Sequence, residues 1–168
     1  MAAVATGVRR SRDRGEYIES YLGEILVACP RCGQCARHVR LDPTDRSACA
    51  PRRLACSSCG FTKEWRGKRL QVAKLGGAES DGYFGLALWL QASVCGQTLW
   101  AYNYRQLGAI ERMVRATLRE RRPGANGWSN QSLISRLPRW VKSARNRKVI
   151  LQEIERLRGS VGGRRTRR

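Results

Sequence analysis

Two pairs of closely spaced cysteines are the residues of this chain best suited to chemistry. The sequence is CPRCG over residues 29–33 and CSSCG over residues 56–60. A C-x-x-C turn places two thiolates on one side of a tight loop, and the glycine that follows permits the positive φ that closes the turn. Two such turns offer four thiolates to one tetrahedral Zn²⁺, with Zn–S bonds of about 2.3 Å. The predicted zinc ligands are Cys29, Cys32, Cys56 and Cys59.

The predicted zinc is structural, because four thiolates leave no open coordination position for water. A redox dithiol is the alternative use of a C-x-x-C turn. The chain has seven cysteines, and its N-terminus lacks the apolar region of a signal peptide. Both features favour metal binding over disulfides, and we expect a cytoplasmic location, with an Arg-rich transit peptide as the alternative.

The remaining cysteines and the single histidine have simpler interpretations. Cys35 and Cys49 could replace a zinc ligand or pair with each other, but we interpret both as spare small residues. Cys95 precedes Gly96 in a candidate hairpin turn and is interpreted as an ordinary thiol. We expect His38 to be an exposed strand residue, with a ligand role as the alternative.

The two cysteine turns, in the pattern CPxCG…CxxCG, resemble those of zinc-ribbon proteins, including the ribbons of transcription factors. The resemblance covers residues 25–66 and implies a three-stranded antiparallel ribbon around the four-cysteine zinc site. The two pairs are separated by the 23 residues from 33 to 55, a little more than in common ribbons. A turn-rich loop at residues 42–51 accounts for the excess. The resemblance leaves the function open, because ribbons also mediate protein contacts.

The chain is strongly basic along its whole length. It has 33 Lys and Arg against 13 Asp and Glu, a net charge of +20, and a mean hydropathy of −0.51. The two terminal segments, 1–15 and 159–168, carry +3 and +4, so the body between them keeps +13. Such a field attracts polyanions, of which nucleic acid is the commonest. Codon bias is an alternative source of the Arg excess, but it does not explain the shortage of acids.

Two groups of basic side chains are candidate nucleic-acid contacts. One surrounds the cysteines, where Phe61 and Trp65 either stack on bases or close the ribbon core. The other lies on predicted helices, and the sequence from Arg121 to Gln152 contains no acid. Solvated helix faces normally mix both signs, so this stretch favours a polyanion. The candidate contacts are Arg31, Arg37, Arg52, Arg53, Lys63, Arg66, Arg112, Arg115, Arg119, Arg139, Lys142 and Arg145.

Hydrophobic periodicity predicts strands around the cysteine turns. Residues 16–27 form a short helix that leads into a strand. Residues 36–41 and 61–66 alternate apolar and polar side chains, which is the period of a strand. Residues 83–102 form a hairpin that turns at Cys95.

Helical patterns follow the hairpin. An apolar stripe predicts a helix over residues 104–122, with Asn103 as its N-cap. A second helical region covers residues 130–158, and Pro138 kinks or splits it. Asn146 caps the later piece. The same stripe places Trp140 in the core.

We therefore predict an α+β fold, with an N-terminal antiparallel zinc ribbon followed by a β-hairpin packed with two or three α-helices. The predicted organisation is a disordered basic tail at 1–15, a zinc-ribbon domain at 16–74, a linker at 75–82, a β-hairpin plus helical domain at 83–158 and a disordered basic tail at 159–168.

The sequence predicts a nucleic-acid-binding regulatory or accessory factor with one structural Zn²⁺, and DNA is favoured over RNA. The alternative is a zinc-ribbon adaptor that docks on a larger protein through the aromatic segment 83–102. No membrane association is expected, because no window of 18 apolar residues occurs. An enzyme is not predicted, because no catalytic triad, P-loop or Rossmann pattern is found. The acids Asp42, Asp45, Glu79 and Asp81 are interpreted as ordinary loop residues.

Overall fold

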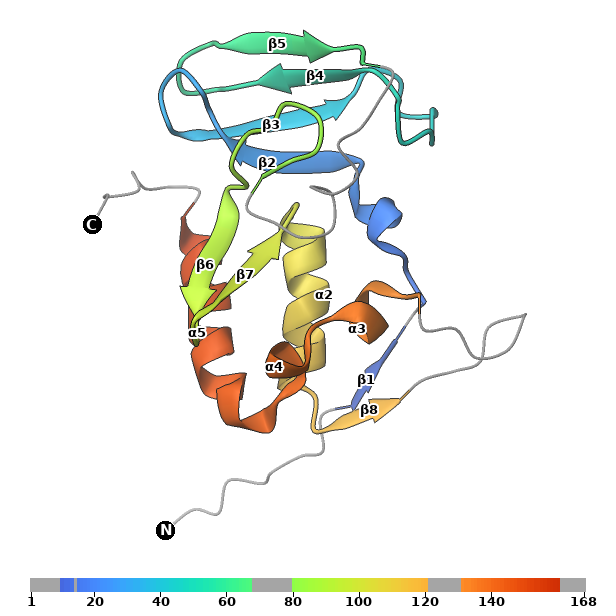
Figure 1. Ribbon diagram of the computed structural model, residues 1–168, viewed down its shortest axis with the longest axis vertical. Helices are drawn as coiled ribbons and strands as arrows, with labels where there is room; N and C mark the ends of the chain where they lie inside the picture. The colour runs from blue at the N-terminus through green and yellow to red at the C-terminus, as the bar shows by residue number, and fades with distance from the viewer. Residues whose placement is uncertain (1–9, 14, 68–79, 121–130, 161–168) are drawn as a thin grey trace.

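The computed structural model describes residues 10–13, 15–67, 80–120 and 131–160, which fold into a sheet layer packed on helices (Figure 1). The sheet is antiparallel with strand order β2-β3-β4-β5. It confirms the predicted α+β class, with one strand more than the three that the zinc-ribbon resemblance implies. The strands are β2 (Glu24–Ala28), β3 (Cys35–Arg40), β4 (Arg52–Ala55) and β5 (Thr62–Trp65).

A separate hairpin follows the sheet, as predicted. It consists of β6 (Leu90–Val94) and β7 (Gln97–Ala101). The two residues between the strands, Cys95 and Gly96, have φ values of 52° and 73°. Two positive φ values in a two-residue loop match the right-handed twist of the strands, and glycine adopts one of them without strain.

The helices begin and end at local signals that the sequence carries. The side chain of Asn103 accepts a hydrogen bond from the backbone N–H of Gln106 at 3.0 Å, which confirms the predicted N-cap. Ser132 caps the next helix, and Pro138 separates two short helices. The helices are α2 (Tyr104–Arg115), α3 (Leu133–Arg136), α4 (Arg139–Lys142) and α5 (Arg147–Gly159), with 3₁₀ turns η1 (Ile18–Tyr21) and η2 (Ala144–Asn146).

The helix predicted over residues 104–122 ends early. Ala116 leaves the helix with φ −69° and ψ 134°, and β8 (Leu118–Glu120) follows. β8 pairs in parallel with β1 (Arg10–Arg12), inside the segment predicted to be a disordered tail. Both predictions were wrong at these residues, because pairing between segments so distant in sequence leaves no local pattern. Residues 1–9 and 121–122 lie outside the described residues.

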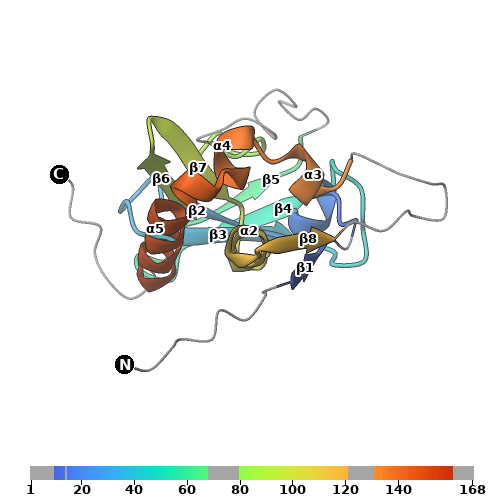
Figure 2. The same ribbon diagram turned by 90° about the horizontal axis from the view of Figure 1, so that it is seen from below.

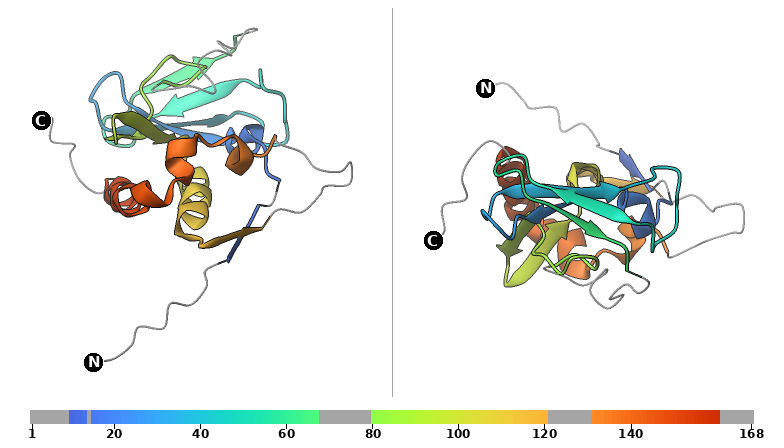
Figure 3. Two further views of the ribbon diagram at one scale, coloured as in Figure 1. Left: turned by 60° about the horizontal axis from the view of Figure 1, so that its bottom comes forward. Right: turned by 90° about the horizontal axis from the view of Figure 1, so that it is seen from above.

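Two groups of buried side chains form the core, and β2 contributes to both. Leu26 packs with Trp89, the hairpin, α2 and α5. Ile25 and Val27 point to the other group, which includes Leu54 of β4. In Figure 2, α2 and α5 lie in front of the strands of the sheet, and in Figure 3 the sheet forms a layer of its own against the helices.

Backbone hydrogen bonds also join the sheet to the hairpin. On the edge of β2 that does not face β3, the N–H of Leu26 donates to the carbonyl of Tyr102 at 2.8 Å. The N–H of Trp89 donates to the carbonyl of Leu26 at 2.9 Å, and that of Ala28 to Ala87 at 2.8 Å. The edge of the sheet is therefore covered by residues beyond the predicted linker.

The predicted division into domains stays a prediction. Most of the proposed linker, residues 75–79, lies outside the described residues, as does most of the proposed C-terminal tail. Within the described residues, the helices are too short or too polar to cross a bilayer.

The aromatic segment 83–102 belongs to the core. Its residues Leu88, Trp89, Leu90, Leu99 and Ala101 are all buried. This agrees with its interpretation as a core hairpin and leaves little of it for a partner that would dock there.

Candidate metal centre and basic surfaces

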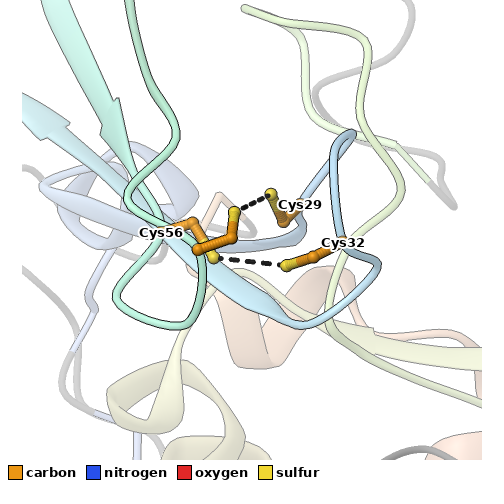
Figure 4. A group of neighbouring side chains, drawn as sticks. Cys29, Cys32 and Cys56 are labelled. Atoms are coloured by element: carbon orange, nitrogen blue, oxygen red, sulfur yellow. Dashed lines mark hydrogen bonds between the residues drawn. The ribbon is translucent and has the colours of Figure 1, made fainter.

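The four cysteines of the two predicted turns meet in space. Their Sγ atoms all lie within 4.8 Å of one another. The distance is 3.7 Å from Cys29 to Cys59 and 3.6 Å from Cys32 to Cys56 (Figure 4). These distances are far longer than the ~2.05 Å of a disulfide. They match the edge of ~3.8 Å that a tetrahedron with ~2.3 Å metal–sulfur bonds requires, so the four thiols can hold one metal ion.

The two turns are built alike, and each one is closed by the same pair of backbone hydrogen bonds. In the first, the N–H of Gly33 donates to the carbonyl of Cys29 at 2.9 Å, and the N–H of Cys29 donates to Gln34 at 2.8 Å. In the second, Gly60 and Cys56 make the corresponding bonds at 3.0 and 2.9 Å. Gly33 and Gly60 have φ values of 71° and 70°. This confirms the predicted role of the glycines, because side chains rarely tolerate that conformation.

The backbone of the two turns also affects the pKa values of the cysteine thiols. Burial opposes ionisation of the Cys56 thiol, but the backbone N–H groups of Cys59 and Ser58 and two neighbouring thiols lower its pKa to about 7. At Cys32 the backbone N–H of Gln34 favours the thiolate, but burial and hydrogen bonds from the other three thiols raise the pKa to about 12. The Cys56 thiolate therefore forms readily, whereas ionisation of Cys32 needs a positive charge at the centre.

The other cysteines lie outside this cluster. Cys35 is half-buried, and burial together with the nearby Cys56 raises its pKa to about 11. Cys49 and Cys95 are exposed, and none of the seven cysteines forms a disulfide. Among the described residues, the groups with metal-binding geometry include none of these three, nor His38.

Three residues that the sequence places on the surface are instead completely buried. His38, Arg52 and Asp81 are each 0% exposed. His38 was expected on an exposed strand face, Asp81 in an ordinary loop, and Arg52 among the nucleic-acid contacts. Because Arg52 cannot reach a ligand from this position, we remove it from the candidate surface. One signal could have found it: Arg52 alternates with the buried Leu54 and shares its face of β4.

The three side chains form a chain of polar contacts beneath the sheet. The Arg52 Nε donates to His38 Nδ1 at 2.8 Å, so the imidazole proton lies on Nε2, 3.5 Å from Asp81 Oδ1. Arg52 Nη2 also donates to the carbonyls of Leu22 and Gly23 at 2.6 and 3.1 Å. The neutral imidazole thus connects a buried cation to a buried carboxylate.

Asp81 organises the loop that follows it. Its carboxylate accepts backbone hydrogen bonds from Tyr83, Phe84 and Leu86 at 2.7–2.8 Å. Burial raises the pKa of this carboxyl, but the contact with His38 and the backbone N–H groups outweigh it, and the pKa lies below its ordinary value. Burial lowers the pKa of His38, although Asp81 favours its charged form.

The basic residues on the sheet share their surface with acids. Arg37 lies 3.6 Å from Glu24, and Arg53 and Arg66 both contact Glu64 at 2.9 Å. The remaining candidates here, Arg31 and Lys63, are exposed. This surface has mixed charge, as solvated faces usually do.

The helical candidates fall into two sets. On α2, Arg115 pairs with Glu111 at 2.8 Å and Arg112 is exposed. Around α4, Arg139 and Arg145 are exposed, while Lys142 donates to the carbonyl of Ser135 at 2.6 Å. Arg119 lies in β8, and its side chain is outside the described structure.

No protein-family model, curated protein or solved structure matches this chain. The resemblance to zinc ribbons therefore rests on the two cysteine turns and the antiparallel sheet, and the function has to be argued from the site itself.

The adjacent residues Arg52 and Arg53 provide a matched test of the buried network. Arg52→Ala removes a buried guanidinium and leaves His38 and two carbonyls unpaired, so we expect a loss of about 3 kcal/mol or more in the free energy of unfolding. Arg53→Ala removes an exposed ion pair and should cost about 1 kcal/mol or less. Urea unfolding measures both values, and equal losses would contradict the assigned role of Arg52.

The lowered pKa of His38 predicts a pH dependence of stability. Below about pH 6.5 the unfolded chain takes up a proton that the folded chain excludes, so stability is full above this pH and is lost as the pH falls towards the folded pKa. His38→Gln removes the only histidine. Its unfolding free energy should therefore change less between pH 7 and pH 5 than that of the unmodified protein. Any metal loss at low pH affects both proteins, so parallel curves would contradict the prediction.

Proposed function

We propose that this protein binds nucleic acid, as a regulatory or accessory factor, and that a structural zinc ion at Cys29, Cys32, Cys56 and Cys59 holds its N-terminal sheet together. The observation that carries the nucleic-acid proposal is the stretch of residues 131–152, which contains no acid of its own and presents four exposed cations outside every ion pair of the described residues. The zinc proposal rests on the geometry and chemistry of the four thiols.

The donor set suits zinc. A tetrahedral set of four thiolates is typical of Zn²⁺ or of iron, and it leaves no position for a substrate or a water. A bound ion would supply cross-linking and charge neutralisation, not catalysis. It would join the β2–β3 turn to the β4–β5 turn and so fasten the outer strands, where β5 has little buried surface of its own.

The exposed cations of the sheet differ from those of the short helices in whether acids compensate them. On the sheet, exposed arginines are compensated by Glu24 and Glu64. Between Arg121 and Gln152 the sequence has no acid, and none of the ion pairs within the described residues involves the exposed cations of this stretch. These cations are Arg136, Arg139, Arg145 and Lys148.

Exposed cations that no acid compensates repel one another unless an anion lies among them. Phosphates repeat at regular spacing along nucleic acid and can contact several arginines at once. Arg also suits bidentate contacts to phosphate and to guanine. We expect DNA as the partner, and labelled RNA is the comparison.

The zinc proposal predicts the behaviour of Cys56→Ser. Structural zinc contributes about 10–16 kcal/mol of apparent binding energy, which is comparable with the total stability of a domain. The variant should lose its single zinc ion and unfold its N-terminal sheet, as measured by elemental analysis and thermal unfolding. Cys49→Ser, outside the cluster, is the control and should keep both the zinc ion and the folded sheet. Iron in place of zinc, or unchanged metal content in Cys56→Ser, would contradict the proposal.

The nucleic-acid proposal predicts a steep dependence of binding on salt. A protein that makes about 6 phosphate contacts should lose roughly a thousandfold in affinity between about 50 and 200 mM salt. Fluorescence anisotropy with labelled DNA and RNA measures this slope. Arg139→Ala/Arg145→Ala should reduce the slope by about 2, since each residue accounts for one phosphate contact. The control with the same loss of charge, Arg53→Ala/Arg66→Ala, should change it little. Weak binding that is equal for all ligands and absent at physiological salt would refute the proposal.

A further inference from the structure

A hollow lies between β7, α2 and the short helices α3 and α4, and the exposed Arg136 is among its lining residues. Its volume is about 220 Å³. Binding sites for drug-sized ligands measure about 300–1,000 Å³, so this hollow suits a smaller group. The walls are mainly apolar and carry two indole rings; they include Leu99, Trp100, Ile110, Leu133, Leu137 and Trp140.

The polar groups of the hollow limit what it can accept. Gln106 is buried, and its Oε1 already accepts the backbone N–H of Tyr102 at 2.8 Å. Arg136 is exposed and also lines the hollow, so it can meet an anion there. This arrangement fits a flat apolar group that carries negative charge outside the hollow.

The hollow and the stretch of residues 131–152 share the same short helices. Trp140 stands between Arg139 and Lys142 in α4, and Arg136 ends α3. Both helices belong to the stretch without acids. If a ligand inserts an aromatic ring into this hollow, its negatively charged groups lie close to Arg136 and Arg139.

We propose that this hollow receives one unstacked base of a single-stranded nucleic acid while Arg136 and Arg139 contact the neighbouring phosphates. The inference rests on the proposed nucleic-acid binding and specifies its class. Every base has a flat π-face that aromatic side chains can contact, at about 1–3 kcal/mol per base. In a duplex the bases are stacked and paired, and exposing one costs a few kcal/mol. A single strand avoids that cost.

The test compares three labelled ligands of equal length on the zinc-loaded full chain. They are a thymidine oligonucleotide, an abasic strand with the same number of phosphates, and a duplex. The thymidine strand should bind about tenfold more tightly than the abasic strand, which corresponds to one stacked base. Trp140→Ala should abolish that difference, and Trp140→Phe should keep most of it.

The outcomes are distinguishable. If the thymidine and abasic strands bind equally well with a steep salt slope, the base-binding inference fails and the proposed function stands. If none of the ligands binds, the proposed function itself fails. If Trp140→Ala does not fold, a second experiment tests the inference on the unmodified protein. A single strand that contains 5-iodouracil is cross-linked to the protein by light. Adducts at Trp100 or Trp140 support the proposal, and adducts found only elsewhere overturn it.

Discussion

The double role of β2 is the constraint on which the rest of the structure depends. One edge of this strand pairs with β3, and the other is hydrogen-bonded to the hairpin segment through Leu26 and Ala28. Successive side chains of a strand point to opposite faces, so Leu26 and its neighbours fill two different cores. A small sheet with an open edge would expose unpaired backbone groups. Here the hairpin segment covers that edge, and Leu26 shares a core with the hairpin and the helices.

A buried network of polar side chains links β3 and β4 to the residues that precede β2 and to the loop after Asp81. Arg52 of β4, His38 of β3 and Asp81 come from three separate segments of the chain. A guanidinium and a carboxylate in the interior are costly unless each is paired or hydrogen-bonded. The imidazole between them and the backbone groups they contact pair most of these polar atoms, while Arg52 Nη1 and His38 Nε2 make no hydrogen bond within the described residues. The network therefore holds the loop after Asp81 at one position under the sheet.

The proposed metal and the proposed binding surface lie in different parts of the molecule. The cysteine turns lie in the sheet layer, whereas α4 and the start of α5 lie at the opposite end in Figure 1. Under the proposals above, the ion maintains the fold without touching the ligand. The sheet carries arginines compensated by acids, and the short helices carry uncompensated ones beside an apolar hollow. This division of charge distinguishes one basic surface from the other, which net charge alone does not.

The sequence by itself determined the features that depend on neighbouring residues. These are the two cysteine turns with their glycines, the turn at Cys95, the cap at Asn103 and the break at Pro138, since each is dictated by the backbone preferences of one or two residues. Only the tertiary structure decided which charges are buried and where the first helix stops. The alternation of Arg52 with Leu54 suggests which face of the strand it lies on, but the contacts with His38 of β3 and with Tyr83 in the loop after Asp81 are what bury it. The helix ends at Arg115, and β8 beyond it pairs with β1, more than a hundred residues earlier in the chain. Such contacts are set by the global packing, and no local pattern encodes them.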